Sequence, residues 1–329
     1  MNVRLSIVIV NWNTRDILLD CIRSIESTSG GVSLEVIVVD NGSRDGSAEA
    51  VERMFPNCIV IRNAENRGFA AANNVGIVRA SGKYICLVNS DVEVLDSCFQ
   101  RMCDYMDENP SIGALGPKIL NRDLTLQRSC SELPSLRNAL MQAVFLDRLF
   151  PGLRWFRNRF MESFDYQRAT EVPVLSGCFL MARREAIEEV GLLDEDFFMY
   201  KEDVDWCKRI GDAGWKVSFS PSARAIHYGG ASSASAPARF LIELEKANRQ
   251  YFRKHHSRLQ GALMNGICAL HYFVRLIAWQ VISICRPGLR PSARERVAQY
   301  GTCLGWMTGR GGKIRNNRVE GTKEVRYPA

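Results

Sequence analysis

Two carboxylates with the spacing of a metal site follow one apolar segment of this 329-residue chain. Asp91 and Glu93 come directly after the run Tyr84–Val88. Mg²⁺ and Mn²⁺ are typically held by one or two carboxylates while substrate phosphates complete the coordination shell. The competing interpretation is a helix cap, because Asp91 stands just before the expected helix Leu95–Met106. The pair by itself leaves both interpretations open.

A second acidic cluster opens a later helix. Glu202, Asp203 and Asp205 follow the aromatic run Phe197–Tyr200. Acidic side chains at a helix N-terminus complement the helix dipole, and aromatic neighbours also raise the pKa of a carboxylate toward that of a general base. His227 comes after the last expected strand, as either a ligand or a structural residue. Both features therefore keep a functional and a structural interpretation.

These side chains need a scaffold, and the N-terminal part of the chain has the pattern of one. Short β-branched runs, apolar throughout, alternate with amphipathic segments, which is typical of a parallel sheet covered by helices on both faces. Strands are expected at Leu5–Val10, Leu34–Val39, Cys58–Ile61 and Tyr84–Val88, and helices at Asp16–Ser27, from near Ser47, at Ala70–Ala80 and at Leu95–Met106. Ligands bind beyond the carboxyl ends of the strands in such sheets. We therefore expect an α/β fold with its chemistry just after these strands.

The pattern loosens over residues 121–170 and then returns. A strand region is expected at Val172–Arg183, helices at Arg184–Val190 and Glu202–Ala213, and a strand at Lys216–Ser220. A Ser/Ala-rich linker, Ala231–Ala238, precedes a C-terminal helical appendage. We expect a catalytic domain over residues 1–235 and a membrane-associating or oligomerising helical region with a basic tail over residues 236–329.

Charge and cysteine usage constrain the surroundings of the protein. From Arg286 to the end the chain holds 10 Lys/Arg and 3 Asp/Glu, so this tail carries the whole net charge of +7. Such a tail is either a solvated end or a contact for anionic lipid or nucleic acid. The 11 cysteines lack paired or metal-ligand spacing, which indicates buried thiols in a reducing compartment. The run Leu5–Val10 is too short for a signal peptide, which favours a cytosolic start.

One C-terminal segment has nearly the length of a membrane span. Gly261–Cys285 is rich in large apolar residues, but His271, Arg275 and Gln280 interrupt it. A central arginine is costly in lipid, so an interfacial helix fits better than a spanning one. A helix packed in a soluble core or an oligomer is the third alternative. The basic tail that follows favours adhesion to an anionic leaflet.

The motifs of the chain, taken in order, resemble glycosyltransferase family 2, and within it the branch of rhamnosyltransferases and related polysaccharide-assembly enzymes. The resemblance covers residues 4–235 and is carried by Ile7–Asn13, Val38–Ser43, Asn66–Ala70, Asn73–Asn74, Asn89–Asp91, Ser176–Gly177, Glu202–Asp205 and His227. It implies a GT-A fold, in which residues 1–120 form the nucleotide-sugar-binding half and residues 121–235 the acceptor and catalytic-base half.

The resemblance also implies a role for each matching position. Asp40 is expected to hold a uracil or thymine base or its ribose. The rest of the nucleotide-sugar pocket is expected to come from Asn11, Asn13, Asn66, Arg67, Gly68, Asn73, Asn74 and Asn89. Asp91 is implied as the principal metal ligand and His227 as a metal or diphosphate contact, while Glu93 stands where the family often has a second Asp. Asp203 is implied as the catalytic base, with Gly177, Glu202 and Asp205 on the acceptor side.

The implied activity is metal-dependent, inverting transfer of one sugar. A nucleotide-sugar donor needs Mg²⁺ or Mn²⁺ to neutralise its leaving group. The first candidate is L-rhamnose from dTDP-L-rhamnose, and the acceptor is a saccharide or a polyprenyl-diphosphate-linked saccharide. A UDP-hexose transferase and an inactive, membrane-associated binding protein are the alternatives. A nicotinamide-dependent oxidoreductase is disfavoured, because Asn11–Thr14 stands where its glycine-rich turn would be.

The resemblance further implies a cytoplasmic protein, peripheral at the inner face of the cytoplasmic membrane. The expected partners are the dTDP- or UDP-sugar, the acceptor and an anionic membrane surface. A homodimer through the C-terminal helices is a further expectation, and no nucleic acid is expected to bind.

Overall fold

The computed structural model describes residues 3–149, 164–229 and 237–309. They divide into two compact units. The first takes in the described residues of Met1–Leu133 and Arg159–Ser232, and the second those of Pro134–Asn158 and Ser233–Ala329. The described residues 134–149, which the sequence places in the acceptor half, therefore belong with the C-terminal helices.

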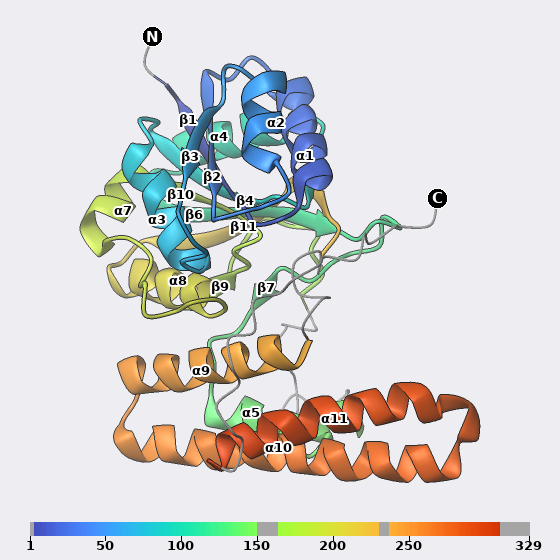
Figure 1. Ribbon diagram of the computed structural model, residues 1–329. Helices are drawn as coiled ribbons and strands as arrows, with labels where there is room; N and C mark the ends of the chain where they lie inside the picture. Colours follow the sequence, from blue (N-terminus) through green and yellow to red (C-terminus); the bar gives the residue numbers. More distant parts are fainter. Residues whose placement is uncertain (1–2, 150–163, 230–236, 310–329) are drawn as a thin grey trace. The chain divides into compact units, whose positions relative to one another are not determined.

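The first unit is built on a nine-stranded sheet in the order β3-β2-β1-β4-β10-β6-β11-β5, with β8 paired to β11 (Figure 1). The strands are β1 (Leu5–Asn11), β2 (Leu34–Asp40), β3 (Ile59–Arg62), β4 (Tyr84–Asn89), β5 (Val92–Leu95), β6 (Ile112–Leu120), β8 (Thr170–Glu171), β10 (Phe179–Arg183) and β11 (Lys216–His227). β1, β2, β3, β4, β6 and β11 run in one direction, and β5, β8 and β10 run against them. A separate small sheet pairs β7 (Cys130–Ser131) with β9 (Val174–Leu175).

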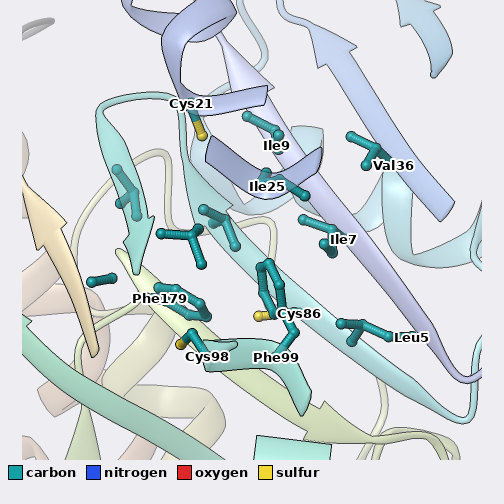
Figure 2. Close-up of a cluster of buried hydrophobic side chains, with 14 of the residues drawn as sticks. Leu5, Ile7, Ile9, Cys21, Ile25, Val36, Cys86, Cys98, Phe99 and Phe179 are labelled. Carbon is teal, nitrogen blue, oxygen red and sulfur yellow. The ribbon is translucent and has the colours of Figure 1, made fainter. Parts of the chain in front are cut away.

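Helices cover both faces of the large sheet, as the apolar strands predict. They are α1 (Arg15–Thr28), α2 (Ser47–Met54), α3 (Phe69–Arg79), α4 (Cys98–Glu108), α7 (Arg184–Val190) and α8 (Glu202–Asp212). Leu5, Ile7 and Ile9 point to the face that α1 and α4 cover, where they join the main core cluster (Figure 2). Val8 points to the other face, where a Cβ on Gly76 of α3 would lie 2.3 Å from its Cγ1. Strand alternation thus serves two apolar layers.

The sequence analysis missed two strands around residues 91–120. The helix expected at Leu95–Met106 is present as α4, which begins three residues later, at Cys98, because β5 runs to Leu95. β6 was not predicted, and β11 continues beyond Ser220 to His227. β5 takes its hydrogen-bonding partners from β11, more than 120 residues later. Pairing between such distant segments overrides the local preference that single-sequence patterns report.

The second unit is helical throughout its described residues. It consists of α5 (Leu136–Ala143), α6 (Leu146–Leu149), α9 (Pro237–His255), α10 (Arg258–Cys285), the short 3₁₀ turn η2 (Pro287–Leu289) and α11 (Arg290–Met307). Its core gathers Ile242, Tyr272 and Cys303 from the three long helices. The Tyr272 hydroxyl donates to Glu245 at 2.9 Å, so α9 and α10 also share a buried polar contact.

Candidate active site

Asp91 and His227 meet at the edge of the sheet, where β5 and β11 pair. Val92 of β5 lies opposite His227 of β11, and the backbone N–H of Tyr228 donates to the Asp91 carbonyl at 3.0 Å. This ladder brings Oδ1 of Asp91 within 3.2 Å of Nε2 of His227. Asp91 is buried and precedes a strand instead of a helix, so the helix-cap interpretation is wrong.

The His227 ring is oriented by Gln127. Nδ1 of His227 lies 2.6 Å from Oε1 of Gln127, and Nε2 of Gln127 donates to the His227 carbonyl at 3.1 Å. With Nδ1–H donating to this amide oxygen, the lone pair of Nε2 faces Asp91. A histidine held by its other nitrogen in this way is the usual arrangement of a metal ligand. The sequence analysis missed Gln127, because its segment shows no periodicity and its partner lies 100 residues away.

The pair fits a hard divalent cation that is shared with a substrate. Asp91 offers an oxygen and His227 a nitrogen, while Oδ1 of Asn89, close by, is buried without a hydrogen-bond partner among the described residues. Mg²⁺ and Mn²⁺ take few protein ligands when substrate phosphates supply the others. The part of the chain that the structure describes contains no group of three His, Cys, Asp or Glu side chains placed for a metal.

Glu93 does not join this pair. The side chains of Val92 and Val94 are buried in the main core, so strand alternation turns Glu93 to the other face of β5. There its carboxylate accepts from the Tyr228 hydroxyl at 2.5 Å, which contributes to the raised pKa of Tyr228. The structure therefore brings together two of the three side chains expected at the metal.

Asp203 stands in the first turn of α8, held by two backbone N–H groups. Its Oδ2 accepts from Gly177 at 2.9 Å and its Oδ1 from Val204 at 2.8 Å. The two residues before the helix, Tyr200 and Lys201, have φ of 70° and 67°. Left-handed backbone at ordinary residues costs free energy, and such residues are enriched at functional sites. Gly177 is also needed here, since a Cβ on it would lie 3.2 Å from Cβ of Asp203.

A three-residue segment, Ser176–Cys178, connects Asp203 to the Asp91 side of the site. The Cys178 carbonyl accepts from the backbone N–H of Asn89 at 2.9 Å, two residues before Asp91. Burial, together with the charges of Asp91 and Asp203, raises the pKa of the Cys178 thiol to about 12. The two carboxylates therefore flank the same short segment, within electrostatic reach of one thiol.

The two neighbours of Asp203 have other environments. Asp205 is 0 % exposed and accepts from Nε of Arg209 at 2.8 Å, so it is a structural ion pair inside α8 and not an acceptor contact as expected. Glu202 is buried, and its Oε2 has no hydrogen-bond partner among the described residues. Burial, and then the charge of Asp203, hold the pKa of Glu202 well above its usual range. Burial therefore favours the protonated form of Glu202, next to the candidate base.

Asp40 is the last residue of β2 and lines a cavity. Its Oδ1 accepts from Nδ2 of Asn11 at 3.2 Å, and its Oδ2 accepts from the backbone N–H of Ser43 at 3.1 Å. The cavity has a volume of about 230 Å³ and is lined by Asp40, Gly42, Ser43, Arg44, Gly46, Ser47, Ala48, Glu49, Arg62, Asn63 and Ala64. Asn11 is fully buried, so it orients Asp40. Asn13 accepts from the backbone N–H of Arg44 at 2.8 Å and fixes the same turn.

Asn41, to which the sequence analysis gave no role, links this turn to the next one. Its Nδ2 donates to Oδ1 of Asn66 at 3.0 Å and to the Gly68 carbonyl at 3.1 Å. Its Oδ1 accepts from Nδ2 of Asn63 at 3.0 Å and from the backbone N–H of Arg67 at 3.1 Å. Its position directly after Asp40 was the one available signal. Asn66 and Gly68 therefore shape the turn behind Asp40.

Of the remaining asparagines of the expected pocket, Asn74 holds the loop 191–201 that leads into α8. Asn74 is buried, accepts from the Leu193 backbone N–H at 3.1 Å, and donates to the Leu193 carbonyl at 2.9 Å and to Glu195 at 3.0 Å. Asn73 donates to the carbonyl of Phe69, inside its own helix, at 2.9 Å. Arg67 pairs with Glu195 at 3.4 Å. Asn74 thus anchors the loop and has no donor left for a sugar phosphate.

Gly68 lets this loop approach the start of α3. Its φ is +88°, and a Cβ would lie 2.4 Å from the Phe198 carbonyl oxygen. The backbone N–H of Phe69 donates to that same oxygen at 2.7 Å. The two halves of the first unit are therefore joined at Gly68, which contacts Phe198, five residues before Asp203, and Asn41, directly after Asp40.

Comparisons with known proteins identify the family. A family model, Glycosyl transferase family 2, matches residues 6–191. The chain is 32 % identical over 239 residues to the N-acetylglucosaminyl-diphospho-decaprenol L-rhamnosyltransferase of Mycobacterium tuberculosis, covering 68 % of this chain and 76 % of that one. It is 23 % identical over 295 residues to the low-salt glycan biosynthesis hexosyltransferase of Haloferax volcanii, with 87 % and 88 % covered.

Among solved structures, the fold matches a mannosyltransferase of Pyrobaculum calidifontis in complex with GDP-Man and Mn²⁺. The TM-score is 0.54 at 15 % identity, over 92 % of this chain and 87 % of that one. At this identity the likeness concerns the fold alone, which confirms the expected GT-A architecture. The chain belongs to glycosyltransferase family 2, is a glycosyltransferase, and lies in the rhamnosyltransferase-like branch of that family.

Proposed function

We propose that the protein transfers one sugar from a nucleotide-sugar donor to a lipid-linked saccharide, with inversion and with a divalent metal ion. The proposed donor is dTDP-L-rhamnose, from which L-rhamnose is transferred, because the mycobacterial relative is an L-rhamnosyltransferase that acts on a diphospho-decaprenol-linked sugar. The acceptor is accordingly a saccharide on a polyprenyl diphosphate. We assign donor binding and sugar transfer to the first unit, which holds every site residue described above.

The observation that carries the proposal is the arrangement of Asp91, His227 and Asp203. Asp91 and His227 lie 3.2 Å apart, and Asp203 lies across Ser176–Cys178 from them. A Mg²⁺ or Mn²⁺ ion held by the first two would neutralise the negative charge that develops on the departing nucleoside diphosphate. Asp203 accepts the proton of the attacking hydroxyl from the opposite side of the sugar. A single displacement inverts the anomeric carbon.

Asp40 and its surroundings supply the binding of the nucleoside. The cavity beside Asp40 lies just beyond the carboxyl ends of β2 and β3, where sheets of this type take their ligands. Asn11 and Ser43 hold the carboxylate in place, so it can accept from a base N–H or a ribose hydroxyl. The turn 40–46 therefore forms the nucleoside side of the site.

The proposed acceptor determines where in the cell the protein acts. We propose a cytoplasmic protein that is peripheral at the inner face of the cytoplasmic membrane, since a polyprenyl-linked acceptor is confined to a bilayer. The small-molecule partners are then the dTDP-sugar and the lipid-linked saccharide.

Calorimetric titration with dTDP, UDP and GDP, each with Mn²⁺ and then with EDTA, tests the proposal. We expect metal-dependent binding with dTDP preferred. A preference for UDP would favour a hexosyltransferase, as in the Haloferax relative. Transfer from the preferred donor, followed by NMR of the product anomer, then tests inversion. Binding that is unchanged by EDTA, or a product of retained configuration, would overturn the proposed mechanism.

A further inference from the structure

Helix α10 presents a continuous apolar stripe to solvent. The exposed residues are three, four or seven positions apart, so they share one face of the helix. They are Leu259, Leu263, Leu270, Phe273, Ile277, Val281 and Ile284. From Leu259 to Ile284 the stripe is about 38 Å long at 1.5 Å per residue. An exposed apolar surface of this length marks an interaction site.

Arg275 and Tyr272 of α10 point away from this stripe, whereas the exposed Gln280 lies beside it. Arg275 donates to the Gln142 carbonyl at 3.0 Å and packs over the Phe145 ring, so its guanidinium is engaged by the α5 end of the unit. Tyr272 is buried against α9 and α11. The central arginine that speaks against lipid contact in the sequence is therefore not on the exposed face.

The second unit is strongly basic, and the first is acidic. The ranges 134–158 and 233–329 hold 21 Lys/Arg against 6 Asp/Glu, or +15, whereas the rest of the chain holds 22 against 30, or −8. The charge expected for the tail alone is thus spread over the whole second unit. Between Lys246 and Arg294 there is no Asp or Glu. Exposed Arg253, Lys254 and Arg258 precede the stripe, and exposed Arg286 and Arg290 follow it.

We propose that the stripe of α10 docks the second unit onto an anionic phospholipid bilayer, with the helix lying along the interface. An apolar stripe with basic ends matches the headgroup and acyl layers of such a surface. Charge selects the bilayer over a second copy of the chain, since two units of +15 repel each other. α10 alone among the described helices has the length and composition to cross a membrane, but crossing would pull Arg275 and Tyr272 from their partners.

The proposal rests on the proposed function, because a membrane-bound acceptor gives the docking its use. Its test uses the purified full chain and sedimentation with vesicles of phosphatidylcholine, with and without phosphatidylglycerol. The variant Phe273→Ser/Ile277→Ser removes two half-exposed apolar groups from the stripe. The control Val78→Ser removes a more exposed one, 74 %, from α3 of the first unit. Metal-dependent nucleotide binding is measured on all three proteins.

We expect binding to the anionic vesicles only, weakened by salt, with a loss of roughly tenfold in the double variant and none in the control. Equal vesicle binding by the double variant would overturn the proposal. A wild-type dimer that the double variant converts to monomer would assign the stripe to a second copy, and resistance to alkaline extraction would assign it to a span. If nucleotide binding fails while vesicle binding follows the expectation, the proposed function falls and the docking surface stands.

Discussion

Substitution of Asp203 and of Asp205 in α8 should have opposite effects on activity and stability, although the two residues lie two positions apart. Asp203→Asn removes the proposed base but keeps its shape. The carboxylate accepts from two backbone N–H groups, and an amide oxygen can keep one of these bonds. The loss is then about 1 kcal/mol of stability, or roughly 2–4 °C in Tm. A general base contributes about 10²–10⁴ to the rate, so kcat should fall by that factor.

Asp205→Asn should lower the stability strongly and leave kcat nearly unchanged. Asp205 is fully buried and bonded to Arg209, which is largely buried as well. Removing one partner of a buried ion pair costs about 3–5 kcal/mol. The amide still accepts a hydrogen bond, so we expect the lower end of that range and a Tm lower by roughly 6–12 °C. At a temperature where the variant is folded, kcat should stay within a few-fold of wild type.

The assay combines thermal unfolding with initial rates of transfer from the donor that calorimetry identifies. Metal-dependent nucleotide binding is the common control, and both variants should retain it because neither residue contacts the nucleotide side. The reasoning fails if Asp203→Asn turns over at more than about one tenth of the wild-type rate. It fails equally if Asp205→Asn loses activity while its Tm is unchanged.

Three further predictions concern the metal pair, the neutral acid and the loop contact. Asp91→Ala should weaken nucleotide binding at least roughly tenfold with Mn²⁺ and little with EDTA, by calorimetry. Because the pKa of Glu202 is raised, the contribution of this residue to stability is fully present below the ordinary value of 4.5 and is lost as pH rises toward the folded pKa. Glu202→Gln lacks this loss, so its Tm advantage over wild type should grow with pH, and a constant difference would contradict a buried neutral acid. Gly68→Ala places a Cβ 2.4 Å from the Phe198 oxygen and should cost about 1–3 kcal/mol in denaturant unfolding, whereas Gly211→Ala, with open space around it, should cost nothing.

Much of the donor half could be read from the sequence because its strands are short, apolar and bounded by polar turns. β1, β2, β3 and β4 lie within one or two residues of their expected positions. β1, β2 and β4 are largely buried, so their composition reports their environment directly, while β3 is the half-buried edge strand. The polar residues Asp40 and Asp91 lie after strands, as the architecture requires. The expectation of chemistry at that edge followed from the same pattern.

The errors lie where distant segments meet. Glu93 has the spacing of a second ligand, but its strand turns it toward Tyr228. Asn74 has the chemistry to bind a phosphate, but its amide is used up by Leu193 and Glu195. Neither partner can be identified from the local sequence, because the contacts span 119 residues or more. Side-chain type therefore gave the chemistry, and tertiary contacts decided which residues were available for it.

The pairing of β5 with β11 also decides which segments of the chain can change in evolution without moving the metal pair. Asp91 and His227 are held together by strand pairing and not by the chain that runs between them. That intervening chain can change length and sequence without moving the ligands, provided that β6, β10 and β11 still form and that Gln127 still orients His227. An exchange of segments between relatives that begins after Gln127 and spares His227 should therefore leave the metal pair intact. A chimera built at this boundary should keep its donor nucleotide and acquire the acceptor preference of the other parent.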